Sequence, residues 1–370
     1  MTVLFFSAFL LNTGLTVALL GVTFYLIARF QATLFQLGLL SGIGAFVFMV
    51  GALSCGKFLS ARTPAKVLTL FGVSLFILTF LILPHLPSLG SVYLIYPIGS
   101  LGMGLFWPSL ERWISSANDA SSLKRSIGLF NLSWSPGQIL GPFLAGFLHE
   151  KGVFLPIWFG ISLAIPVLPL LSFAQERKKT HSSSDQGKPL GKPPPFLIFC
   201  WLTNFSSWVA MSIFRSLFPK YGLSLGLTPT TIGLFLLLIG TGQVLFFWIL
   251  SRREGWEKRP RFFLGWEGVA FLAVLAVAFG YHPLLWTFAF FLFGCFAGVA
   301  YSGSILLSLK DSQRAGRYAG FHETIIGLGL CLGPFVGGIA GNVFGGNAPY
   351  FVSAALLGSV MLVQLWLIWS

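Results

Sequence analysis

Residues 128–146 read GLFNLSWSPGQILGPFLAG, and residues 320–338 read GFHETIIGLGLCLGPFVGG. The two stretches lie 192 positions apart, and five Gly and Pro residues of the first are identical to their partners in the second. The first set is Gly128, Gly137, Gly141, Pro142 and Gly146, and the second is Gly320, Gly329, Gly333, Pro334 and Gly338. A repeat at so long a spacing predicts that the chain consists of two similar halves.

Small residues recur at every fourth position within each copy. They are Gly137, Gly141 and Ala145 in the first copy, and Gly329, Gly333, Gly337 and Gly341 in the second. On a helix this spacing forms a stripe that lets another helix approach closely, which is how helices associate inside a membrane. One such stripe fits ordinary helix packing, but two copies with the same Gly-Pro step are far more specific.

The sequence around the two copies is that of an integral membrane protein. Of 370 residues, 55% are hydrophobic and 9% are charged, and the mean hydropathy is +0.84. A helix needs about 20 apolar residues to cross a bilayer, and twelve apolar runs reach that length. They are 3–28, 33–57, 66–84, 91–114, 126–148, 153–174, 196–218, 229–251, 262–281, 284–307, 318–342 and 348–369. The sequence therefore predicts an all-α membrane protein with twelve spanning helices.

One polar segment separates the first six runs from the last six. It reads QERKKTHSSSDQGKPLGKPPP over residues 175–195 and is basic, rich in serine and closed by three prolines. Such a composition is typical of a solvated linker. We therefore expect an N-terminal six-helix bundle at 1–175, a cytoplasmic linker at 176–195 and a C-terminal six-helix bundle at 196–370.

The cations predict the orientation of the chain. Nineteen of the 23 Lys and Arg residues fall in the even-numbered connections and four on the other side. By the positive-inside rule, both termini lie in the cytoplasm, and the membrane is expected to be a bacterial inner membrane. The net charge of +13 is spread over short clusters that suit lipid headgroups, so no nucleic-acid partner is expected.

Twelve helices, two repeated halves and a basic linker resemble the major facilitator superfamily. Antiporters of that family carry, in their fifth helix, Gly, eight residues, Gly, three residues, Gly-Pro, two residues and Gly-Gly. Residues 320–338 match this motif in full, and residues 128–146 match it with Ala145 in place of one glycine. The resemblance implies two six-helix bundles that expose a central site to either side of the membrane in turn. The family's loop between helices 2 and 3 is altered here, because Ser60 stands at its usual Asp position.

Three ionisable residues within the apolar runs are candidates for substrate binding or coupling, because a charge at the bilayer centre costs roughly 2.5–3.5 kcal/mol. Glu323 is predicted to couple transport to protons or to gate, with a structural hydrogen bond as the alternative. Arg215 is predicted to hold an anionic substrate group or to close the outer gate, unless it only reaches the outer headgroups. Glu111, followed by Arg112, is predicted to form an ion pair at the inner gate or an ordinary interfacial pair. Glu267 is expected to contact loop arginines and is not a candidate.

Polar and aromatic residues of other runs are predicted to line the cavity. The candidates are Asn131, Gln138, Trp107, Trp134, Asn204 and Tyr301. Asn131, Trp134 and Gln138 share one helix face, because they recur at three- and four-residue steps. The four cysteines and five histidines show no metal-ligand spacing, so no metal or cofactor is expected.

These features predict a secondary transporter, not an enzyme. We expect a monomer embedded in the lipid bilayer that moves a small molecule by alternating access. Protons are expected to drive the transport, and efflux is favoured over uptake. An uptake symporter for a small organic solute or anion is the alternative. An intramembrane enzyme or lipid-handling protein is a third class, but the sequence shows no convergent nucleophile and base for it.

The predicted topology can be tested by cysteine accessibility in intact cells. A cysteine introduced at Pro87, in an outer loop, should react with a membrane-impermeant reagent added outside. A cysteine introduced at Asp185, in the linker, should be spared. Labelling of position 185 from outside would contradict the predicted orientation.

Overall fold

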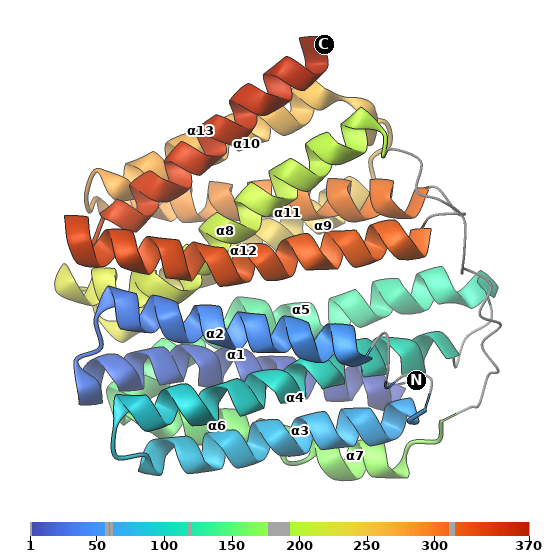
Figure 1. Cartoon of the computed structure of the whole chain (residues 1–370), viewed down its shortest axis with the longest axis vertical. Coiled ribbons are helices and arrows are strands. Elements are labelled where there is room, and N and C mark those ends of the chain that lie inside the picture. The colour runs from blue at the N-terminus through green and yellow to red at the C-terminus, as the bar shows by residue number, and fades with distance from the viewer. Residues whose placement is uncertain are drawn as a thin grey trace.

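A computed structural model describes residues 2–55, 59, 62–116, 120–176, 193–310 and 315–369. Within these ranges, the side chains of 115–116, 120–129, 131, 315–317, 319 and 369 lie outside the description. Every long element of the described residues is a helix, and the helices run roughly side by side across the molecule (Figure 1). Most of the predicted linker, 177–192, falls outside the described residues, so the proposed domain division stays a prediction.

The helices before the linker correspond to the first six predicted runs. They are α1 (Thr2–Phe30), α2 (Leu34–Ser54), α3 (Ala65–Ile82), α4 (Leu89–Ser116), α5 (Ala120–Lys151), α6 (Leu155–Ala164) and α7 (Val167–Phe173). The last two form one span that is interrupted next to Pro166, the residue before α7. A proline interrupts a helix there because its nitrogen carries no hydrogen to donate.

The helices after the linker correspond to the last six runs. They are α8 (Pro195–Ser224), α9 (Pro229–Ser251), α10 (Pro260–Ala278), α11 (Pro283–Lys310), α12 (Ala315–Phe344) and α13 (Ala348–Trp369). Eleven spans among the described residues are long and apolar enough to cross a membrane. The twelfth long helix, α5, is more polar, since it carries Lys124, Arg125 and several Ser, Asn and Gln residues. The predicted all-α membrane architecture is confirmed.

The helix starts follow from local chemistry in the sequence. Thr33 caps α2 in a capping box with Gln36, so the side chain of each accepts a hydrogen bond from the backbone N–H of the other. Thr228 accepts from the backbone N–H of Thr231 at the start of α9. Proline occupies the first turn of α8, α9 and α10. A backbone N–H in the first turn has no acceptor within the helix, so proline loses no helical hydrogen bond there.

The glycine stripes pack inside their own halves except at Gly341, where a Cβ would lie 2.7 Å from the Leu34 Cδ1 of α2. The stripe of α5 lies against α1, where a Cβ built on Gly141 would come within 2.7 Å of the Thr16 Cβ. The stripe of α12 lies against α8, where a Cβ on Gly329 would come within 2.7 Å of the Trp208 Cβ. The two contacts are copies of each other, and both therefore confirm close helix approach at the repeated motif.

A pair of hydrogen bonds repeats the same symmetry. The Thr16 hydroxyl in α1 donates to the Gly137 carbonyl in α5 at 2.9 Å. The Ser212 hydroxyl in α8 donates to the Gly329 carbonyl in α12 at 3.0 Å. Hydroxyls can reach a neighbouring backbone in this way only where glycine allows the helices to approach.

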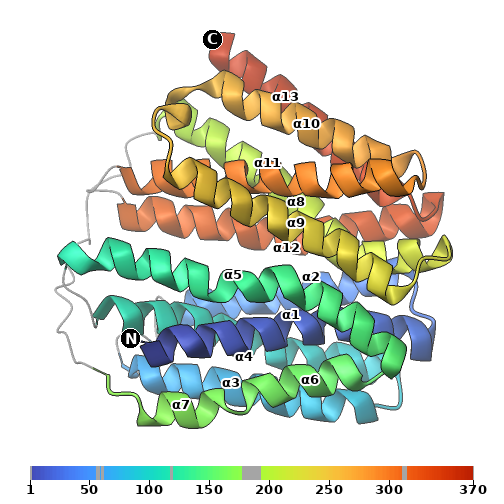
Figure 2. The same ribbon diagram turned by 180° about the vertical axis from the view of Figure 1, so that it is seen from behind.

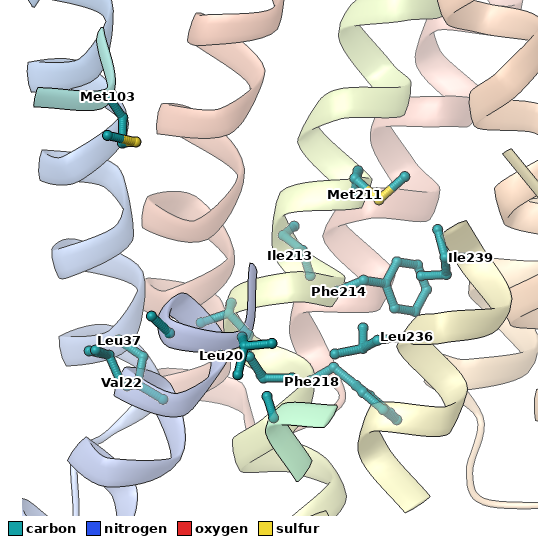
Figure 3. Packing of buried hydrophobic residues seen from close by; sticks show 14 of the residues in the cluster. Leu20, Val22, Leu37, Met103, Met211, Ile213, Phe214, Phe218, Leu236 and Ile239 are labelled. Atoms are coloured by element: carbon teal, nitrogen blue, oxygen red, sulfur yellow. The ribbon is translucent and has the colours of Figure 1, made fainter. Parts of the chain in front are cut away.

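Apolar side chains fill the space between the helices. Figure 3 shows Phe214 and Phe218 of α8 beside Leu236 and Ile239 of α9, and all four are buried. The Phe214 ring also lies 4.9 Å, centroid to centroid, from the Phe290 ring of α11. Aromatic pairs at such distances add to the packing that holds α8, α9 and α11 together.

Contact between the two halves is concentrated in two helix pairs that lie on opposite sides of the molecule, with smaller contacts of α8 to α1 and α2. One pair is α2 with α12 and the other is α5 with α9. In Figure 1, α2 and α12 lie side by side and diverge toward the end of the molecule that carries the linker. Figure 2 shows α5 and α9 meeting at the opposite end.

Replacing Gly333 by Leu should lower the melting temperature of the purified protein, because its side chain would collide with Val209 and Ser212 of α8. Overpacking of this kind costs about 1–3 kcal/mol. Gly141→Leu should have a similar effect through Thr16. The control is Gly90→Leu, since a Cβ at Gly90 meets nothing closer than the Ser88 Oγ at 3.7 Å. Equal melting temperatures for Gly333→Leu and Gly90→Leu would show that the close approach is unimportant.

Candidate functional site

A cavity of about 450 Å³ lies between the two halves. It is lined by α1, α2, α3, α4 and α5 on one side and by α8, α9, α11 and α12 on the other. Because both halves contribute, any change in their relative position changes the shape of the cavity. A cavity of this size accommodates a small organic molecule.

Seven of the nine predicted site residues line this cavity. They are Glu111, Trp107, Trp134, Gln138, Arg215, Tyr301 and Glu323. Asn204 is buried outside it, and its Nδ2 lies 3.5 Å from the Nδ1 of His322. Asn131 belongs to α5, but its side chain lies outside the described residues. The sequence thus located the three charged residues of the lining, Glu111, Arg215 and Glu323, without identifying their partners.

Arg215 connects the two halves inside the cavity. Its Nη2 donates a hydrogen bond to the Oε1 of Gln138, so a residue of α8 bonds to a residue of α5. Among the described residues, no carboxylate forms an ion pair with Arg215. The guanidinium therefore retains charge that an anionic ligand group can neutralise, and it points into the cavity, not toward the headgroups as snorkelling would require.

Two carboxylates lie at the end of the cavity nearest the linker. Glu111 is exposed, and the side chain of Glu323 is 67% exposed. Arg112, the neighbour of Glu111, donates from its Nη2 to the carbonyl of Thr63 at 2.9 Å. The exposure of both carboxylates shows that water reaches the cavity from the linker end, so both can exchange protons with it.

His322, a buried histidine that is not among the predicted site residues, lies beside Glu323. The Nε2 of His322 lies 3.9 Å from the Oε1 of Glu323, and its Nδ1 lies 2.7 Å from the Oγ of Ser304 in α11. The His322 ring also packs edge-on against Tyr301. In the sequence, His322 stands out only by its position next to Glu323. The sequence does not show that Ser304 of α11 lies against His322.

Nine aromatic side chains contribute to the wall of the cavity. Besides Trp107, Trp134 and Tyr301, the lining includes Phe48, Phe76, Phe80, Tyr96, Phe130 and Trp208. Aromatic faces bind flat apolar groups and attract cations. No group of three His, Cys, Asp or Glu residues in the described part of the chain is arranged to hold a metal ion.

The end opposite the linker is closed by two matching backbone contacts. Gly38 of α2 lies against the carbonyl of Pro334 in α12, and Gly233 of α9 lies against the carbonyl of Pro142 in α5. A Cβ on Gly38 would come within 2.9 Å of the Pro334 carbonyl carbon. A Cβ on Gly233 would come within 2.9 Å of the Phe143 Cα. The Gly-Pro step of each repeat thus touches a glycine of the opposite half.

The last glycine of each repeat extends the same closure. Gly146 lies against Pro229 at the start of α9, and a Cβ on Gly338 would come within 2.7 Å of the Leu34 carbonyl at the start of α2. Glu150 adds a polar contact, because its Oε1 accepts a hydrogen bond from the backbone N–H of Thr230 at 2.9 Å. One motif therefore serves two surfaces: its middle glycines pack within a half, and its final residues pack between halves.

Comparison with known proteins gives a consistent match. The family model described as Major Facilitator Superfamily matches residues 4–330. Quinolone resistance protein NorA of Staphylococcus aureus is 22% identical, over 98% of this chain and 95% of its own length. Multidrug resistance protein 2 of Bacillus subtilis is 24% identical, over 82% of this chain and 78% of its own length. An uncharacterized transporter of Methanocaldococcus jannaschii is 25% identical, but the match spans only 44% of this chain and 42% of that protein.

Solved structures agree on the fold. The nucleoside transporter NupG superposes with a TM-score of 0.79 at 12% identity, over 99% of this chain and 98% of that one. An identity this low shows the fold alone.

Gly38→Leu should open the end opposite the linker while leaving each half folded, because the contacts of Gly38 all belong to α12. An overpacking cost of about 1–3 kcal/mol shifts a two-state equilibrium by roughly 5- to 150-fold. A single cysteine at Ser216, which lines the cavity, should then react faster with an impermeant maleimide added on that side.

The matched control is Gly51→Leu in the same helix, since a Cβ at Gly51 meets Leu101 of α4 within the same half. This variant should lower the melting temperature without speeding the labelling. Slow labelling in Gly38→Leu, equal to that of the parent, would contradict the closure assigned to Gly38.

Proposed function

Since the chain belongs to the major facilitator superfamily, a family of transporters, we propose that it is a proton-coupled exporter of small amphipathic molecules. The protein is a multi-pass membrane transporter and not an enzyme. In the proposed cycle the cavity opens to one side of the membrane and then to the other.

One observation carries this proposal: a cavity between two halves, open at the linker end and closed at the other by matching contacts. The contacts involve backbone and glycine, so they can form and break without deforming the helices. If the linker is cytoplasmic, as the cation distribution predicts, the cavity faces the cytoplasm. An exporter would load its substrate in this state.

The lining supports an aromatic substrate with an anionic or polar group. The wall is aromatic, with a cation at Arg215 near the closed end and carboxylates at the open end. A flat apolar body would lie against Trp107 and Trp134, while an acidic group would replace Gln138 as the partner of Arg215. The drug-resistance names of two relatives support this substrate class.

We assign the coupling step to Glu323. Its carboxylate reaches the cavity water, and His322 lies beside it on the buried side. Closure of the linker end would remove that water and favour the protonated acid, because a buried carboxylate without a partner is costly. Glu323 would then release its proton when water returns. Glu111, across the cavity, is the alternative carrier.

An uptake symporter would use the same cavity and the same carboxylates. The two functions differ in how the two movements are related: an exporter moves substrate opposite to the protons, and a symporter moves both in the same direction. We further propose that the protein acts as a monomer in a bacterial plasma membrane with both termini in the cytoplasm.

Glu323→Gln should abolish substrate accumulation driven by a pH gradient while retaining exchange of substrate across the membrane. Glutamine keeps the shape and hydrogen bonding of a neutral carboxyl but does not titrate. The measurement is transport in sealed vesicles, with an imposed pH gradient of either sign and a panel of small aromatic acids and zwitterions that includes a quinolone.

Glu254→Gln serves as the control, because Glu254 lies in an exposed loop outside the cavity. Full accumulation by Glu323→Gln would move the coupling role to Glu111. Accumulation with the opposite gradient sign would identify a symporter.

A further inference from the structure

A polar cluster lies buried among α8, α10 and α13, apart from the cavity. Its members are Glu267 of α10, Thr203 and Ser206 of α8, and Gln364 of α13, and each is completely buried. None of them lines the cavity. Glu267 was expected to contact loop arginines, but its described partners are these uncharged side chains instead.

The hydrogen bonds of this cluster leave two oxygen atoms without a donor. The Ser206 hydroxyl donates to the Oε1 of Glu267 at 2.9 Å. The Nε2 of Gln364 lies 2.8 Å from the Oγ1 of Thr203 and 3.3 Å from the Phe199 carbonyl, so it donates to both. The Oε2 of Glu267 and the Oε1 of Gln364 are both buried and both unpaired.

Turning the Gln364 amide over would place its oxygen 3.3 Å from the carbonyl of Phe199, which is also an acceptor. The same turn would let the Thr203 hydroxyl donate to that oxygen. The Phe199 carbonyl favours the orientation in which the amide nitrogen faces it. In this orientation the Oε2 of Glu267 and the Oε1 of Gln364 have no donor.

We propose that Glu267 is a proton-binding site and carries its proton as a neutral carboxylic acid. The proton forms an O–H bond at Oε2, which then donates to the Oε1 of Gln364. One added proton thus satisfies both unpaired oxygens.

The surroundings of Glu267 disfavour its charged form. An ionised carboxylate this deeply buried needs a cation or several donors, but the polar groups beside it are uncharged: the Ser206 hydroxyl, which donates to it, and the Gln364 side chain. No Lys or Arg of the described residues forms an ion pair with Glu267. The titratable group that faces it from α8 is the thiol of Cys200, and α11 and α13 supply no charged group that acts on it.

The proton joins three helices, so its loss has a mechanical consequence. A charged Glu267 would draw water between α10, α13 and α8. The opposite face of α8 carries Trp208, Ser212 and Arg215, which line the cavity. The protonation of Glu267 therefore sets how firmly the outer helices hold the helix that carries the candidate substrate-binding arginine.

Infrared difference spectroscopy of the purified protein at neutral pH tests this proposal. The wild-type protein should show the C=O stretching band of a protonated carboxylic acid, and Glu267→Gln should lose it. Glu323→Gln should keep that band, so the result does not depend on the proposed coupling role of Glu323. Retention of the band in Glu267→Gln would overturn the proposal.

Gln364→Met provides a second readout that keeps Glu267 in place. Methionine offers no comparable acceptor, so the band should shift in frequency. An unshifted band would contradict the hydrogen bond to Gln364.

Thermal unfolding adds an independent measurement. Loss of the proton would leave a buried charge without a cation beside it, so stability should fall as the pH rises and the proton leaves. The melting temperature of wild type should fall at alkaline pH by more than that of Glu267→Gln. Parallel pH profiles of the two proteins would overturn the proposal.

Discussion

The structure depends on how closely backbones of opposite halves can approach without a side chain between them. Gly38 meets the Pro334 carbonyl, and Gly233 meets the Pro142 carbonyl. These contacts form the closed end of the cavity and set the distance across it. They also bring α8 near enough to α5 for Arg215 to reach Gln138. Any larger residue at either glycine would separate the halves and change all of these features together.

Charge is arranged along the cavity in a definite order. The cation lies toward the closed end, and the two carboxylates lie toward the linker. Aromatic rings occupy the space between them. An amphipathic ligand with one acidic group would therefore enter with that group leading, because the field in a cavity of low dielectric constant favours this orientation.

Much of this architecture follows directly from the sequence. Apolar runs of about 20 residues predict the helices, and the Gly-Pro repeat predicts the close contacts, because both depend only on order along the chain. Part of the cavity lining was also predicted, since Trp134 and Gln138 lie four residues apart on one helix face.

What the sequence could not supply is which helices face each other. Gly146 and Gly141 belong to one motif, yet Gly146 contacts α9 and Gly141 contacts α1. Periodicity assigns a residue to a face of its helix but does not say which neighbour covers that face. The same limit hid the partners of Glu267, which come from two other helices far apart in the chain.

The two glycine contact sites also constrain the direction of relative motion. Each site holds the halves at one point, and the two points lie on opposite sides of the cavity. Two fixed points define a line, and a rigid body held at both can turn only about that line. Sliding and twisting of one half over the other are thereby suppressed. Along α2 the contacts continue from Gly38 to Gly42, and along α9 from Gly233 to Gly240. In the proposed cycle this line serves as a hinge axis. The position of Gly42 and Gly240 along the cavity then determines how widely each of its two ends opens when the halves turn.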